Sequence, residues 1–172
     1  MESRAKLFGH AIHPMLIPFP LGMLSASAVF DVIYLFKRKD LWAQIAFWNT
    51  AGGIMSGLVA AAFGLIDWMS IPAGTRAKAI GLRHGVGNVV VVTLFSASWL
   101  LRWREPRRPT TGAIVLSVLG VSLAGVTGWL GGELVERLGV GVDAGANLDA
   151  PSSLSGKPAG SGDQTTRSGD PA

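Results

Sequence analysis

The sequence contains no cysteine and few charged residues. The absence of thiols excludes disulfides, iron–sulfur ligation by this chain, thiolate catalysis and covalent haem attachment through a CxxCH motif. Charged residues make up 15% of the 172 positions, against about 25% in typical globular domains. Because apolar residues reach 49% and the mean hydropathy is +0.40, the composition favours a membrane protein over a soluble domain.

Several motifs of soluble enzymes are also missing. The chain has no glycine-rich phosphate loop, no GxSxG elbow and no HExxH motif. The net charge of +4 and the pI near 10.0 come from basic residues in short clusters between apolar runs, a pattern typical of cytoplasmic loops. We therefore expect the chain to interact with a lipid bilayer and not with nucleic acid.

Four apolar runs dominate the sequence, over residues 14–36, 41–68, 85–103 and 111–134. Each has the length of about 20 residues that crosses a hydrocarbon core. The runs lack the alternation of β-barrel strands, so they predict an all-α fold. We expect an integral membrane four-helix up-and-down bundle over residues 1–143. Residues 144–172 are rich in Gly, Ser, Asp and Pro and are predicted to form a disordered tail.

The first apolar run is expected to remain in the mature protein. It continues past the signal-like ASA at 26–28 and stops at the basic KRK at 37–39, as a membrane anchor does. The densest clusters of lysine and arginine follow the first and third runs. The positive-inside rule therefore predicts that these two loops are cytoplasmic and that both termini face outward.

Polar residues with useful chemistry gather at the predicted outer ends of the four runs. They include all three histidines of the chain: His10, His13, Asp67, His84, Asn88 and Glu133. His84 and Asn88 are four residues apart and share one helical face. We expect this group to meet in one pocket at the outer membrane surface.

Small residues and prolines indicate how such a pocket forms. Two stripes of small residues allow close helix packing: Gly53, Gly57, Ala60 and Gly64, then Gly125, Gly128 and Gly132. Asp67 continues the first stripe and is expected to point into the bundle. Pro18 and Pro20 cannot both sit in a regular helix, so the entry to the first run should be irregular and line a cavity.

Asp31 is a carboxylate inside the first apolar run. Such a residue is by default a candidate functional group. The alternative is a structural role, either through a hydrogen bond to Gln44, Asn49 or Ser98, or through an ion pair with Arg102. The sequence alone leaves these alternatives open.

The chain resembles a bacterial membrane family catalogued as domain of unknown function 2231. The resemblance rests on five motifs in order: GHAIHPMLIPFPLG at 9–22, GLIDW at 64–68, RH at 83–84, GWLGGELV at 128–135 and GVGV at 139–142. Two positions depart from it, since Ala11 replaces a proline and Pro18 stands where some relatives have histidine. The resemblance implies a four-helix bundle in the bacterial cytoplasmic membrane. Related modules fused to Rieske-type or cytochrome c-like domains also suggest redox work.

Three functions fit these residues. In the first, haem b is held by His13 (or His10) and His84 on diagonal helices, with Asp67, Glu133 or Asn88 orienting the ligands, and electrons pass to a redox partner protein. In the second, a single transition metal or a proton relay uses the imidazoles and carboxylates of His10, His13, His84, Asp67 and Glu133. In the third, the chain is a membrane anchor or scaffold without a cofactor, acting with a partner subunit or as a homo-oligomer.

Overall fold

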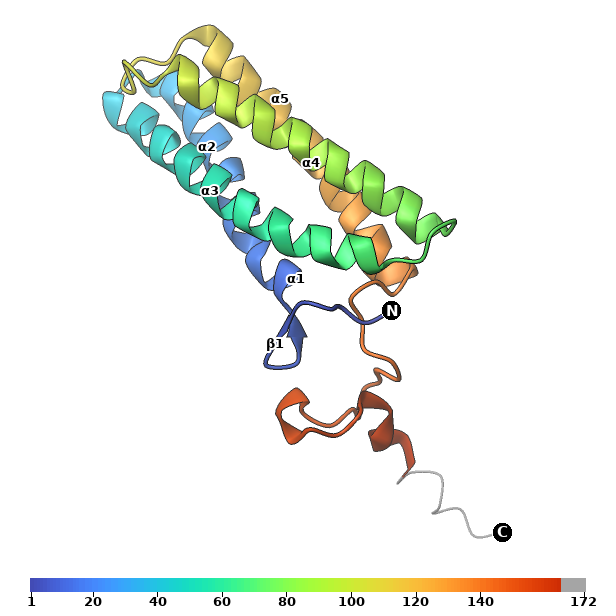
Figure 1. The fold of residues 1–172 in the computed structure, drawn as a ribbon. Coiled ribbons are helices and arrows are strands. Elements are labelled where there is room, and N and C mark those ends of the chain that lie inside the picture. Colours follow the sequence, from blue (N-terminus) through green and yellow to red (C-terminus); the bar gives the residue numbers. More distant parts are fainter. Residues whose placement is uncertain (165–172) are drawn as a thin grey trace.

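The computed structural model describes residues 1–164 and consists mainly of four long helices packed up and down (Figure 1). They are α2 (Pro18–Lys37), α3 (Asp40–Ser70), α4 (Arg76–Leu101) and α5 (Thr111–Gly132). All four are long and apolar enough to cross a membrane. The predicted all-α bundle of four spans is therefore confirmed, and the protein is an integral membrane protein.

The chain enters the bundle through a short irregular segment. Strands β1 (Lys6–Leu7) and β2 (His10–Ala11) form an antiparallel pair, and the single-turn helix α1 (Ile12–Leu16) follows. Ile17 separates α1 from α2, and Pro18 opens α2, where a missing N–H costs nothing. The prediction that Pro18 and Pro20 cannot both sit in a regular helix is wrong, because both lie in the first turn of α2, where backbone N–H groups have no intrahelical partner. The irregular backbone is confined to the segment before Pro18.

The helices pair as two hairpins. We call residues 12–70 (α1, α2 and α3) the first hairpin and residues 76–137 (α4, α5 and the segment that extends α5) the second hairpin. Packing is denser within each hairpin than between them, and α2 lies diagonally opposite α4. Glycine permits the close packing inside each hairpin. A Cβ on Gly53 would lie 2.5 Å from Leu24 Cδ2, and one on Gly120 would lie 2.7 Å from Phe95 Cε2.

Beyond α5 the chain changes character. The last turn widens into a π-helix, η1 (Glu133–Arg137), and residues 144–164 contain turns and two short 3-10 helices, η2 (Ser153–Ser155) and η3 (Ala159–Gln164). The sequence predicted a disordered tail over residues 144–172, and the described part of it, residues 144–164, adds no long helix to the bundle. The last part of the predicted tail, residues 165–172, lies outside the described residues.

Candidate functional site

Two of the three histidines meet in the interior of the bundle. His13 comes from α1 and His84 from α4, and their ring centroids are 6.4 Å apart with the ring planes at 89°. Both rings are partly buried. His84 lies two turns into α4, about 12 Å from its first residue. The predicted diagonal pair therefore lies deeper than the bundle end.

Each histidine is anchored to the partner helix of its own hairpin. His13 Nδ1 is 2.8 Å from the Ala60 carbonyl oxygen, and His84 Nδ1 is 2.8 Å from the Thr127 carbonyl oxygen. Because a carbonyl can only accept, each Nδ1 carries a proton, and in the neutral imidazole Nε2 then carries the lone pair. This is the tautomer that binds metals through Nε2.

Two glycines make room for these rings. A Cβ on Gly64 would lie 2.9 Å from His13 Cε1 and Nδ1, and a Cβ on Gly131 would lie 3.1 Å from His84 Cε1. Any larger residue at Gly64 would push the ring away from Ala60. The glycines are therefore part of the site, because they let the imidazoles rest directly on the helix backbone.

Asn88 distinguishes the two histidines. Its Nδ2 donates to His84 Nε2 at 3.1 Å and to the His84 carbonyl at 3.0 Å, while its Oδ1 accepts from Thr127 Oγ1 at 3.0 Å. Within residues 1–164, His13 Nε2 has no hydrogen-bond partner. The site thus holds one occupied and one free Nε2.

The other predicted site residues lie elsewhere. Asp67 is buried and accepts from Ser3 Oγ at 2.7 Å and from the Arg4 amide at 3.0 Å. It follows Ala60 by seven residues, which places it about 10 Å nearer the helix end than the histidines. The N-terminal segment therefore supplies its partners, and no imidazole does.

His10 and Glu133 also remain outside the histidine pair. Glu133 forms an ion pair with Arg76 at 2.5 Å. Nε2 of the exposed His10 lies 3.4 Å from Ser153 Oγ. Within residues 1–164, no three His, Cys, Asp or Glu side chains are close enough together to hold a metal ion. The structure brings together His13, His84 and Asn88 and does not gather the five residues of the metal hypothesis.

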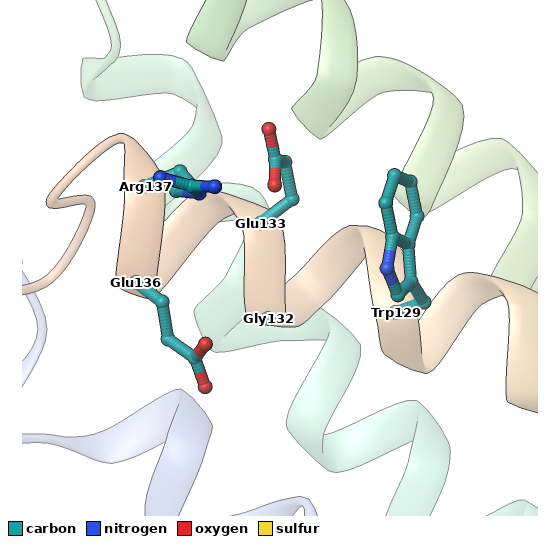
Figure 2. Close-up of a pocket in the computed structure, with 5 residues that line it drawn as sticks. All are labelled: Trp129, Gly132, Glu133, Glu136 and Arg137. Carbon is teal, nitrogen blue, oxygen red and sulfur yellow. The ribbon is translucent and has the colours of Figure 1, made fainter.

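A pocket lies around η1, at the end of α5. It is lined by Trp129, Gly132, Glu133, Glu136 and Arg137. Figure 2 shows Trp129 and Glu133 on one side of this helix and Glu136 on the other. The pocket is therefore a surface feature of one helix, separate from the histidine pair.

A second polar layer lies near the other end of the bundle. Arg102 donates from Nη1 and Nη2 to the two Asp31 carboxylate oxygens, at 2.7 and 3.0 Å. Ser117 Oγ donates to Asp31 Oδ2 at 2.6 Å, and Arg102 also reaches Ser98 Oγ at 2.8 Å. The ion pair, one of the alternatives considered for Asp31, is thus present in the structure. Ser117 and Thr127 were not predicted, because their only signal in the sequence is a hydroxyl within an apolar helix.

Comparison with known proteins points to one family. The family model described as "Predicted membrane protein (DUF2231)" matches residues 9–144. No curated protein and no solved structure matches the chain. The matched region contains both polar layers and all four long helices.

Proposed function

This chain belongs to the DUF2231 family of predicted membrane proteins, and we propose that it is a redox module that binds haem b between His13 and His84. The observation that carries the proposal is the pair of imidazoles on diagonal helices. Their Nδ1 protons are both committed to backbone carbonyls, which leaves Nε2 as the ligating atom on each.

The spacing of the rings supports two-sided ligation. A metal that binds two imidazole nitrogens at about 2 Å each holds their ring centroids roughly 6 Å apart, close to the 6.4 Å between these rings. Since the chain has no cysteine, binding would be non-covalent. A bound haem would accept and release one electron at a time.

The packing of the bundle supports a flat ligand at this position. The histidines come from different hairpins, and the hairpins pack less densely against each other than within themselves. A planar group would have to enter between the hairpins and part the two rings, because the histidines themselves fill the space beside Gly64 and Gly131. Asn88 would have to release His84 Nε2, and its side chain could then keep its bond to Thr127.

The alternative is a scaffold without a cofactor. One observation favours it: His84, Asn88 and Thr127 already form a closed network that links α4 to α5. In that case the histidines are structural, and the chain serves as an anchor for a partner subunit or a second copy. A single transition metal held by the two imidazoles is a third outcome.

An absorption spectrum separates these outcomes. Protein purified in mild detergent from haem-replete cells should show a Soret band that shifts on reduction with dithionite. The band should disappear in His13→Ala and in His84→Ala, and it should persist in the matched control His10→Ala, since His10 lies outside the pair. A colourless wild-type protein would overturn the haem proposal. Elemental analysis of the same sample would then distinguish a bound metal from the scaffold.

We also propose that the protein lies in a bacterial cytoplasmic membrane with both termini outward. Support comes from the exposed arginines of the loop between α4 and α5, which are Arg104, Arg107 and Arg108. Because the chain has no native cysteine, single-cysteine variants report cleanly. In intact spheroplasts, an impermeant maleimide should label Ser153→Cys and leave Arg107→Cys unlabelled. The reverse labelling pattern would overturn this orientation.

A further inference from the structure

The residues of the two polar layers recur at fixed intervals along the chain. His84 follows His13 by 71 positions, and Arg102 follows Asp31 by the same 71. In the partner helices the interval is 67: Thr127 follows Ala60, and Gly131 follows Gly64. The tripeptide Ser-Ala-Ser occurs at 25–27 and again at 96–98, also 71 positions apart.

Residues that match in this way make the same contacts. The histidines hydrogen-bond to Ala60 and Thr127 at the same 2.8 Å distance, and Gly64 and Gly131 touch their rings. Other matched residues also make equivalent contacts inside their own hairpin. Leu24 packs on Gly53 as Phe95 packs on Gly120, and Ser27 donates to the Ala46 carbonyl as Ser98 donates to the Ala113 carbonyl. Thr50 and Ser117, another matched pair, are both fully buried. Sequence interval and structure therefore agree from the histidine layer to the ion-pair layer.

We infer that the two hairpins are copies of one helical hairpin, related by a pseudo-two-fold axis along the bundle, and that Asp31 and Arg102 ensure that each hairpin pairs with its unlike copy. Parallel repeats of this kind occur in membrane proteins. The inference concerns the surface that each hairpin offers to the other, and it does not depend on haem binding.

The axis is located by the residues that meet their own counterparts. On a two-fold axis a residue faces its equivalent, as His13 faces His84 and Asp31 faces Arg102. Two neutral imidazoles can meet there without penalty. Two buried carboxylates or two buried guanidinium groups would repel each other strongly at this depth. The Asp/Arg difference therefore disfavours pairing between like hairpins of two chains.

The surroundings of the ion pair are themselves duplicated. Ser98 in α4 accepts from Arg102, the residue that follows this helix, and Ser117 donates to Asp31 across the hairpin interface. Their equivalents in the first hairpin are Ser27 and Thr50, whose hydroxyl oxygens lie 2.5 Å apart. These two hydroxyls occupy the positions needed to support an arginine at 31 and an aspartate at 102.

A charge exchange tests the inference in the full chain. Asp31→Arg and Arg102→Asp each place like charges on the axis, and each should lose the monodisperse peak in size-exclusion chromatography. The double variant Asp31→Arg/Arg102→Asp should recover the peak and a thermal midpoint near that of the wild type, because the reversed pair finds equivalent hydroxyls. A double variant no better than the single variants would overturn the inference.

A second measurement asks whether the serines exchange roles. Ser98→Ala should lower the thermal midpoint more than Ser27→Ala in the wild type, since Ser98 contacts Arg102. In the charge-exchanged protein the order should reverse, because Ser27 would then contact the arginine. An unchanged order would show that the two environments are not equivalent and would contradict the duplication.

Discussion

The two polar layers join the same two hairpins, yet they differ in how completely their polar atoms are satisfied. In the ion-pair layer, Asp31 and Arg102 are 0% and 1% exposed, and both carboxylate oxygens and all three guanidinium nitrogens are hydrogen-bonded. In the histidine layer, the rings are only partly buried and His13 Nε2 has no partner within residues 1–164. A saturated network holds helices together, whereas an unused lone pair can receive a ligand.

The largest effect should come from opening the ion-pair layer. Arg102→Met leaves the Asp31 carboxylate buried without its partner and should lower the free energy of unfolding by about 3–5 kcal/mol. The measurement is an unfolding titration with a denaturing detergent in mixed micelles. Asp31→Leu/Arg102→Met is the control, because removing both charges should restore most of the loss. If the double variant were as unstable as Arg102→Met, the unpaired charge would not be the cause.

The next largest effect should come from crowding the histidine layer. Gly64→Ala places a methyl group 2.9 Å from the His13 ring, which must move away from the Ala60 carbonyl. Such overpacking costs about 1–3 kcal/mol, and the Soret band should weaken in parallel. Gly128→Ala is the matched control, since a Cβ there meets nothing within 4 Å. Equal thermal midpoints for the two variants would contradict the role given to Gly64.

The comparison of layers also shows what the sequence could reveal. The spans were predictable because lipid demands long apolar helices. The meeting of His13 and His84 was predictable because they stand at the entrances of two spans that are diagonal in an up-and-down bundle. Asp67 and Glu133 were expected beside them, but polar groups at helix ends bond to whatever chain lies nearest. Here that is the N-terminal segment for Asp67 and Arg76 for Glu133.

Arg102 illustrates the opposite difficulty. By position it stands at the end of the third apolar run, next to the basic cluster formed by Arg104, Arg107 and Arg108. In the structure it turns back and is neutralised by Asp31, because its long side chain can reach the diagonal helix. The internal repeat was accessible from the sequence, since the 71-residue interval relates both the histidines and the ion pair. Only the contacts show that both pairs lie on one axis.

A smaller effect is expected from Asn88, which occupies Nε2 of His84 and, within residues 1–164, leaves Nε2 of His13 free. Asn88→Ala removes the donor to His84 Nε2 and one partner of the Thr127 hydroxyl. Interhelical hydrogen bonds in membranes contribute about 0.6 kcal/mol on average, so the thermal midpoint should fall slightly. Haem occupancy should not decrease, because the released Nε2 is the ligating atom. Loss of the Soret band in Asn88→Ala would contradict this expectation and would show that haem binding needs Asn88 to position the His84 ring.

The smallest effect should come from the exposed ion pair between Arg76 and Glu133. The Arg76 side chain is 60% exposed, so water and salt screen the charges, and exposed pairs contribute about 0–1 kcal/mol. Arg76→Gln should therefore change the thermal midpoint little, and any change should vanish in high salt. Arg102→Met, measured in the same salt series, should stay destabilised because the unpaired Asp31 carboxylate is buried beyond the reach of screening ions. A similar salt response in both variants would remove the distinction between a buried pair that joins the hairpins and a surface pair that only borders them.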